Sequence, residues 1–279
     1  MRKLKYYPFF HNNHGLSYTV SAMLITGTTI LLVLIASIYA YQILEQQKGL
    51  SEFEVAKKSM LSYNDALESV AWKLQASRST RFTIEYGLLE LTPNVYSIGI
   101  NATVGGSTWQ LSNTTFPGTN GRIRYTISDK YTSFGSSYTA YLLGNGSNVL
   151  IGSADNYGRV LVSQESSWVS VLLDERVRAM RTSVINVAGK DVNYVDIWVI
   201  KTKMIVGQPW SYIHDFDLKA KCLSIKTVSY GPYSVNNNPS AVISVRIGST
   251  TSTGSVPLAT TSQSQVVFNI VVSEIQVYV

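Results

Sequence analysis

The sequence contains a single cysteine, Cys222, among its 279 residues. One cysteine excludes an intramolecular disulfide. It also excludes cysteine-based zinc sites, because these need several thiolates at fixed spacing. A chain of this length can bury a sufficient core without disulfides. Cys222 stands in the strand-like run KAKCLSIKTV, which indicates a small buried apolar side chain rather than a nucleophile.

Charged residues are also scarce, at 14% of the chain, and the formal net charge is +6. Arg2, Lys3 and Lys5 supply three of these positive charges, so subtracting them from +6 leaves +3 for everything downstream. No run of basic residues is interleaved with aromatics, and we therefore expect no nucleic-acid partner. Few charges with abundant Tyr, Ser, Thr and Asn favour an extracellular β-rich protein over a cytosolic enzyme.

Catalytic motifs are missing as well. The sequence has no phosphate-binding glycine loop, dinucleotide-binding fingerprint, nucleophile elbow or two-histidine zinc motif. Of three histidines, only His214 lies beyond the first 14 residues. Asp215 and Asp217 would share one face of a strand and could approach a cation near His214, but we favour a polar loop. We therefore expect no enzyme activity, no metal site and no cofactor.

One long apolar segment near the N-terminus is the strongest feature that the sequence does contain. Leu16 to Ile43 includes no Asp, Glu, Lys, Arg or His. As a helix with a rise of ~1.5 Å per residue, this segment extends about 42 Å, which exceeds the ~30 Å hydrocarbon core of a bilayer. We predict a helix over 16–43 that either crosses the lipid bilayer or packs in the core of a filament.

A basic leader, residues 1–15, precedes this helix and contains no acidic residue. Because Lys and Arg favour the cytoplasmic side, we expect a cytoplasmic N-terminus, a helix in the cell membrane and an extracellular C-terminal domain. Three Asn-X-Ser/Thr sequences agree with that location. They make Asn101, Asn113 and Asn145 candidate glycosylation sites.

An amphipathic helix is predicted over 44–77, directly after the apolar segment. Its apolar residues recur at alternating spacings of three and four, which is the a/d seam of three heptads. The candidate packing residues are Phe53, Ala56, Met60, Tyr63, Leu67, Val70 and Leu74. Charged residues, Glu52 among them, form the opposite, solvated face, and Gly49 favours a kink or local melting. The seam packs on the chain's own β-domain, on neighbouring copies, or on each along different lengths.

The remaining residues, 81–279, are expected to form a β-rich extracellular domain. About ten short strands without βαβ alternation favour an antiparallel sandwich, built as one domain or as two subdomains divided near 165–175. Gly87 is predicted to serve a hairpin turn, and Asn120-Gly121 a turn between strands. The expected fold class is α+β, with a long N-terminal hydrophobic and amphipathic helix followed by an antiparallel β-sandwich-like domain.

The junction Gly15-Leu16-Ser17, followed by the long apolar helix, resembles archaeal type IV pilin-like proteins, whose precursors carry a class III signal peptide. The resemblance covers about the first 75 residues. It implies that a prepilin-type peptidase cuts between Gly15 and Leu16. It also implies that the helix packs with copies of itself or with other pilin-like subunits in a filament core, while the β-rich head faces outward.

Two functions remain open from the sequence. The first is a structural pilin-like or pseudopilin-like subunit, inserted in the membrane and then assembled into a surface filament or a secretion or adhesion apparatus. The second is a permanently anchored single-pass membrane protein whose extracellular β-domain binds a ligand, a glycan or a partner protein. Cleavage between Gly15 and Leu16 would distinguish the first from the second.

Overall fold

The computed structural model describes residues 18–113, 116–145, 148–153, 155–205, 211–235, 238–261 and 263–279. The predicted leader and the junction Gly15-Leu16 lie outside these ranges. The chain forms two compact units, Met1–Gln47 and Lys48–Val279. The first unit contributes the N-terminal part of one helix, and the second contains the rest of that helix and all the described strands.

Helix α1 (Tyr18–Ala71) includes residues of both units. No proline interrupts it, so the backbone hydrogen bonding of an α-helix can continue along its whole length. In the second unit it supplies ten buried residues between Gly49 and Ala71. The helix continues through Gly49, where a Cβ atom would lie only 2.3 Å from the Tyr131 ring. Glycine therefore admits an aromatic ring at this position, and the expectation of local melting is wrong.

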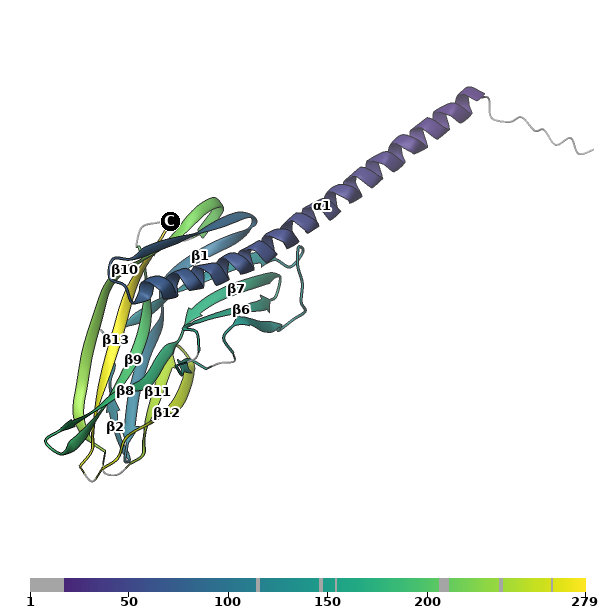
Figure 1. The fold of residues 1–279 in the computed structure, drawn as a ribbon. Helices are drawn as coiled ribbons and strands as arrows, with labels where there is room; N and C mark the ends of the chain where they lie inside the picture. The colour runs from purple at the N-terminus through teal and green to yellow at the C-terminus, as the bar shows by residue number, and fades with distance from the viewer. Residues whose placement is uncertain are drawn as a thin grey trace, which may run out of the picture. The chain divides into compact units, whose positions relative to one another are not determined.

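The described residues also form thirteen strands (Figure 1). These are β1 (Ser77–Val104), β2 (Ser107–Gln110), β3 (Thr119–Ser128), β4 (Thr139–Leu143), β5 (Leu150–Ile151), β6 (Gly158–Glu165), β7 (Trp168–Glu175), β8 (Val177–Val187), β9 (Lys190–Met204), β10 (Ser211–Ser234), β11 (Ser240–Ile247), β12 (Thr250–Pro257) and β13 (Gln265–Tyr278). The main path is β4-β6-β7-β3-β1-β10-β13-β9-β8-β5. In addition, β2 and β11 pair with β1, and β12 pairs with β11. The predicted α+β class is confirmed.

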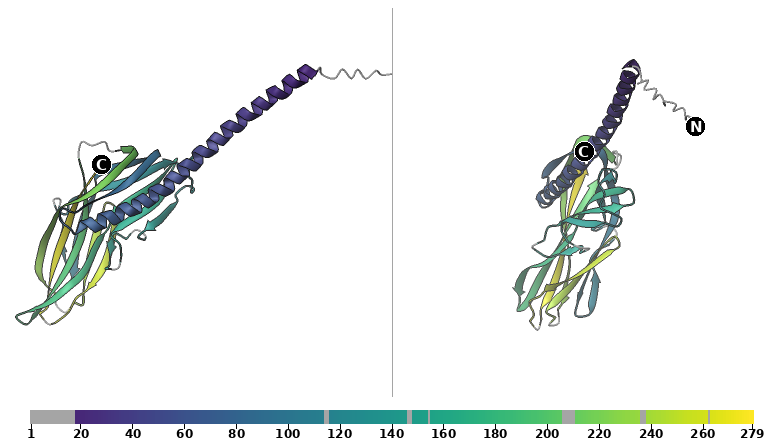
Figure 2. Two further views of the ribbon diagram at one scale, coloured as in Figure 1. Left: turned by 45° about the horizontal axis from the view of Figure 1, so that its top comes forward. Right: turned by 90° about the vertical axis from the view of Figure 1, so that its right-hand side faces the viewer.

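The sheet is mixed, so the expectation of a purely antiparallel domain is wrong. β13, yellow in Figures 1 and 2, lies between β10 and β9. It pairs with β9 in parallel along almost its whole length, and the short β5 pairs with β8 in parallel. A parallel pair needs a crossover rather than a tight turn. Here the connection from β9 to β13 is made by β10, β11 and β12.

The long strands pass through two hydrophobic clusters. Cluster 1 gathers buried side chains from α1, the first half of β1, β3, β6 and β7, with Leu67 and Val171 as examples. Cluster 2 gathers the second half of β1, β11 and parts of β9 and β13, with Ile243 and Phe268 as examples. Because β1, β9 and β13 contribute to both clusters, the domain does not divide along the sequence. The predicted boundary near 165–175 is wrong, since β7 lies there and pairs with both β3 and β6.

The predicted hairpin around Gly87 is one continuous strand, β1. Its pairing with β10 changes register between Ile84 and Leu89, which marks a bulge. A Cβ atom at Gly87 would lie 2.4 Å from the Tyr125 hydroxyl, so glycine allows a close approach inside the strand rather than a turn. Asn120-Gly121 likewise lies within β3 rather than in a turn.

Helix α1 ends at Ala71, earlier than the predicted Ser77. Gln75 adopts a left-handed φ of 64°, and its N–H donates to the Cys222 carbonyl at 3.0 Å, which directs the chain into β1. Leu74 therefore lies in this turn with 61% of its surface exposed, and its predicted place on the packing seam is wrong. Cys222 itself is buried, as its sequence context predicts.

Candidate functional site

The N-terminal part of α1 presents an apolar surface on every side. We call residues 18–44 the apolar segment. Its exposed large side chains are Tyr18, Val20, Met23, Leu24, Ile25, Ile30, Leu31, Leu32, Val33, Leu34, Ile35, Ile38, Tyr39, Tyr41, Ile43 and Leu44. Six of them are consecutive, from Ile30 to Ile35, and six residues exceed one helical turn of 3.6 residues. By length and composition, this helix is suited to crossing a membrane.

The hydroxyl groups of the apolar segment are satisfied within the helix. Thr26 donates to the Ala22 carbonyl at 2.8 Å, and Ser37 donates to the Val33 carbonyl at 2.7 Å. Thr28 and Thr29 make the same kind of bond to carbonyls of the preceding turn. A polar group that already has a partner costs much less to transfer into an apolar environment. These side chains are therefore compatible with lipid or with closely packed helices.

Six residues of the predicted seam pack inside the second unit. Phe53, Ala56, Met60, Tyr63, Leu67 and Val70 are all buried members of cluster 1. Their neighbours in that cluster include Phe82 of β1 and Leu218 of β10. Tyr63 also donates its hydroxyl to the Lys219 carbonyl at 3.3 Å. In the structure these six side chains therefore serve the chain's own β-domain.

Glu52 holds the start of this packed helix to the bulge in β1. Its Oε2 atom accepts from the N–H groups of Glu85 and Tyr86, and its Oε1 atom accepts from the Gly87 N–H and the Tyr125 hydroxyl, all at 2.8 Å. Burial and the nearby Glu52 carboxylate raise the pKa of Tyr125, so its hydroxyl stays a donor. The assignment of Glu52 to a solvated face is wrong. Only the tertiary fold brings three backbone N–H groups to its carboxylate.

A polar cavity of about 240 Å³ lies in the β-domain. Val149, which lines this cavity, belongs to cluster 2, whereas Glu175 follows cluster 1 residues on the buried face of β7. The lining residues come from β1, β3, β6, β7, β11, β12 and the turns between them. They are Tyr96, Asn120, Gly121, Arg122, Val149, Arg159, Asp174, Glu175, Ile247, Ser249 and Thr250.

Glu175 places a carboxylate on the core-facing side of β7. Successive side chains of a strand alternate between its faces, and Val169, Val171 and Leu173 occupy the buried face that Glu175 continues. Glu175 is only 7% exposed, and neither of its carboxylate oxygens has a hydrogen-bond partner among the described residues. Burial first, and then the nearby Glu68 carboxylate, raise the pKa of Glu175 to about 8.

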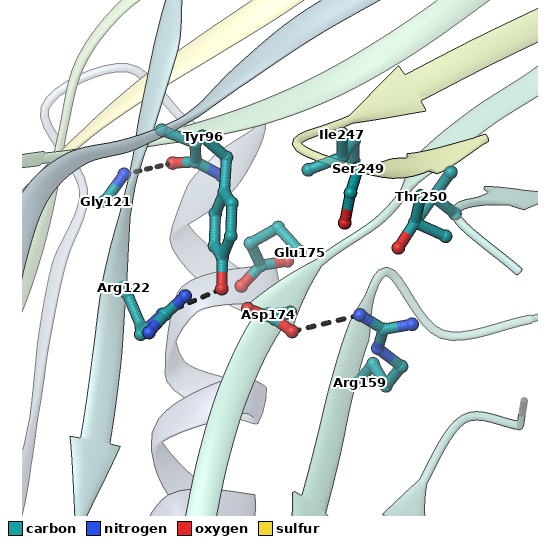
Figure 3. A pocket seen from close by; sticks show the side chains of 11 residues that line it. Tyr96, Gly121, Arg122, Arg159, Asp174, Glu175, Ile247, Ser249 and Thr250 are labelled. Atoms are coloured by element: carbon teal, nitrogen blue, oxygen red, sulfur yellow. Dashed lines mark hydrogen bonds and ion pairs between the residues drawn. The ribbon is translucent and has the colours of Figure 1, made fainter. Parts of the chain in front are cut away.

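Two arginines also line the cavity (Figure 3). Arg122 donates its Nε–H to the Tyr96 hydroxyl at 2.7 Å, and Arg159 donates from Nη2 to Asp174 Oδ2 at 3.0 Å. Asp174 Oδ1 is buried and, within the described ranges, has no hydrogen-bond partner. Figure 3 shows the Tyr96 hydroxyl beside Arg122 and the Asp174 carboxylate beside Arg159. The cavity thus combines two carboxylates with two guanidinium groups.

Asn120 fixes one wall of the cavity. Its Oδ1 atom accepts from both the backbone N–H and the hydroxyl of Thr202 at 2.6 Å, and from the Gly121 N–H at 3.0 Å. These bonds connect β3 to β9. The Asn-Gly pair that was predicted as a turn therefore forms a buried polar junction between strands.

The other candidates from the sequence lie on the surface of the β-domain. Asn101, Asn113 and Asn145 are all exposed, and their glycosylation stays a prediction. His214 lies in β10 rather than in the expected loop, and Asp215 forms a 2.8 Å ion pair with Arg81. Across the part of the chain that the structure describes, no three His, Cys, Asp or Glu side chains are grouped to hold a metal ion.

Of the residues that line the cavity, only Asn120 and Gly121 were singled out from the sequence, and they were predicted as a turn. One signal was present, because Glu175 continues an alternating run of buried apolar residues and thereby places an acid on an apolar face. The remaining wall comes from strands far apart in the sequence, so no local pattern could unite it. A scan against protein-family models, a search of curated proteins and a search of solved structures found no match to this chain.

Proposed function

We propose that this chain is a pilin-like or pseudopilin-like structural subunit of a cell-surface filament or of a secretion or adhesion apparatus. In this proposal a prepilin-type peptidase cuts between Gly15 and Leu16 on the cytoplasmic side. The apolar segment then leaves the bilayer and packs with copies of itself or with other pilin-like subunits, while the β-rich domain lies outside the cell.

The observation that carries the proposal is the exposed apolar surface around the whole circumference of residues 18–44. Burying one large aliphatic side chain contributes about 1.5–3 kcal/mol. Transfer of the sixteen exposed large side chains from water to an apolar environment therefore contributes a favourable free energy on the order of tens of kcal/mol. Lipid and neighbouring helices are similarly apolar, so exchange of one for the other costs little.

The packed half of α1 supports the same proposal. The seam residues and the Glu52 bonds hold residues 52–70 within the β-domain. Helix α1 continues without a break from the apolar segment into this packed half. One element therefore encodes both the surface available to other copies and the residues that anchor the head.

A second candidate function is a permanently anchored single-pass membrane protein with a ligand-binding extracellular domain. The polar cavity around Glu175 favours this alternative, because a purely structural head has no need of a buried charged cavity. In that case the apolar segment would stay in the bilayer and the leader would not be removed.

The two functions differ in the N-terminus of the mature protein. The full chain should be expressed with and without a prepilin-type peptidase, and its intact mass should then be measured. We expect loss of residues 1–15 only when the peptidase is present, and a block of that loss in Gly15→Trp, because the bulky ring replaces a small residue at the cut. Asn12→Ala, in the same leader, is the matched control and should be processed normally. Retention of Met1 in the presence of active peptidase would contradict the pilin-like proposal.

A further inference from the structure

We propose that the outer face of the sheet β2-β1-β11-β12 binds an acidic saccharide, with the carboxylate of one sugar at Arg246 and sugar hydroxyls on the neutral side chains around it. Hexuronic acids such as glucuronate are the simplest sugars of this class. The inference is independent of how the apolar segment is used, so it and the pilin-like proposal can fail separately.

Strand alternation gives this sheet one buried face and one outer face. In β11, Val245 is buried in cluster 2, and its neighbours Ser244 and Arg246 face outward. The side chains of β1 alternate in the same way, so that Asn101 faces outward between buried neighbours. The residues of β1 that belong to cluster 2 are Ile98, Ile100, Ala102 and Val104.

The register brings the outer side chains together. Asn101 lies directly opposite Gln110 of β2 on one side and Ser244 of β11 on the other. Arg246 lies directly opposite Thr251 of β12. Directly paired residues of antiparallel strands share a face and have Cβ atoms about 4.5–5.5 Å apart. These five side chains therefore lie on one surface of the β-domain.

Two adjoining hollows of about 500 and 290 Å³ lie on this surface, and Gly99, Gln110, Ser112 and Arg246 line both. We call the two hollows together the Arg246 groove. A Cβ atom at Gly99 would lie 3.8 Å from Arg246 Nε, so the arginine side chain extends across β1 where glycine leaves room. Figure 1 shows β2, β11 and β12 at the end of the β-domain away from the packed half of α1, which leaves the groove uncovered by that helix.

The acidic end of the ligand is argued from Arg246. Its side chain is exposed and makes no hydrogen bond or ion pair within the described ranges. No Asp, Glu or Lys among the described residues lines either hollow. A guanidinium group presents five N–H donors in a planar fork that matches a carboxylate. One unpaired positive charge in neutral surroundings therefore favours one carboxylate and disfavours a cation.

The hydroxyl groups of the ligand are argued from the neutral side chains. Besides Gly99 and Arg246, every described residue that lines the larger hollow is Ser, Thr, Asn or Gln. Ser112 is only 6% exposed, and its Oγ atom accepts from a backbone N–H of β1 at 2.8 Å, which leaves its O–H to donate to a ligand. The amides of Asn101 and Gln110 both donate and accept, as sugar hydroxyls do.

Other anionic partners fit the groove less well. Protein partners anchor through aromatic and other large side chains in pockets, and among the described residues no apolar side chain lines the larger hollow. A nucleic acid carries one phosphate per nucleotide and is held by several Lys and Arg contacts, whereas this groove offers one guanidinium group. Sulfate or phosphate alone would leave most of the 500 Å³ hollow unfilled.

Asn101 and Asn113 line the groove and are also candidate glycosylation sites, so a glycan attached to either would fill part of it. The proposal gives Asn101 a different role, as a free amide that contacts the ligand. Peptide mass spectrometry of the chain from its native cells distinguishes the two uses. We expect both residues to be unmodified, and a glycan on either would overturn the binding of a free saccharide.

The binding test is calorimetric titration of the full chain, produced without N-glycosylation, in micelles of a detergent that has no sugar headgroup. The acidic probes are trigalacturonate, a hyaluronan tetrasaccharide and sialyllactose, and the neutral probes are the methyl ester of trigalacturonate and lactose. Sodium sulfate tests a simple anion, and tetraglutamate tests an acidic peptide. The variant is Arg246→Gln. Arg78→Gln is the matched control, because Arg78 is an exposed arginine of β1 that does not line the groove.

We expect at least one acidic saccharide to bind, with affinity at least about tenfold weaker in Arg246→Gln, because a hydrogen-bonded charge pair is lost, and unchanged in Arg78→Gln. The neutral saccharides should bind at least about tenfold more weakly for the same reason. Equal affinity in wild type and Arg246→Gln would overturn the role of Arg246. Sulfate or tetraglutamate binding as tightly as the saccharide would overturn the ligand class, and absence of binding by every acidic saccharide would overturn the proposal as a whole. Circular dichroism spectra check that both variants fold.

Discussion

Replacing Glu175 with glutamine should remove a large pH dependence from the stability of the β-domain. In the folded protein the pKa of this carboxyl is about 8, against 4.5 for an unperturbed glutamate. Between these two values the folded state binds one proton more than the unfolded state, so stability falls as pH rises. The stabilisation is complete below pH 4.5 and is lost as the pH passes through about 8.

The magnitude follows from the difference between the two pKa values. Each unit corresponds to about 1.36 kcal/mol, so the whole loss between pH 4.5 and 8 is on the order of 5 kcal/mol. Such a change is comparable with the total stability of many domains. Glutamine keeps the shape of the protonated acid but does not titrate. Glu175→Gln should therefore be close to wild type near pH 5 and clearly more stable than wild type near pH 8.5.

The measurement is urea unfolding of the full chain in detergent, followed by tryptophan fluorescence at several pH values. The difference in unfolding free energy between Glu175→Gln and wild type should grow steadily from pH 5 to pH 8. Glu165→Gln controls for the loss of one acidic residue, because its side chain is 67% exposed and should not give this slope. Equal pH slopes in wild type and Glu175→Gln would refute the reasoning.

Three further predictions concern α1. Glu52→Ala should lower the free energy of unfolding by about 3–5 kcal/mol, because it leaves the N–H groups in the β1 bulge without their carboxylate acceptor. Glu52→Gln should lower it less, and denaturant unfolding of the two variants measures the difference. Leu67→Ala should cost about 2–5 kcal/mol in the same assay, whereas Leu74→Ala, in the exposed turn, should stay within about 0.5 kcal/mol of wild type; equal effects would contradict the corrected helix end. Leu32→Lys should reduce membrane insertion by about 2.5–3.5 kcal/mol, seen as release from membranes on alkaline extraction, and full retention would argue against burial of the apolar segment.

These predictions separate the two parts of α1 by what each one buries. Substitutions of the buried residues in 52–70 should change the stability of the β-domain, because these side chains pack against strands of that domain. Substitutions in the apolar segment should change insertion or assembly without changing that stability. A variant such as Leu32→Lys that altered both would show that the two halves of the helix are energetically coupled.

The candidate cavity shows why its residues could not be predicted together. Tyr96, Arg122, Arg159 and Glu175 are spread over 80 positions and lie on four different strands, β1, β3, β6 and β7. Sequence periodicity reports which face of a strand is buried, but it does not report which strands become neighbours. Glu52 was missed for the same reason, since its four donors come from the β1 bulge and from β3.

The sequence by itself determined the α+β class, the long apolar helix and six residues of its packing seam. These features depend on local composition and on a period close to 3.6 residues, which a single segment carries regardless of its neighbours. Only the tertiary structure decided where the helix ends, that Gly87 and Asn120-Gly121 lie inside strands, and that β13 pairs in parallel with β9. Each of these depends on contacts between residues far apart in the chain, such as Gln75 with Cys222 and Asn120 with Thr202. The energies of such contacts exist only once the strands have paired.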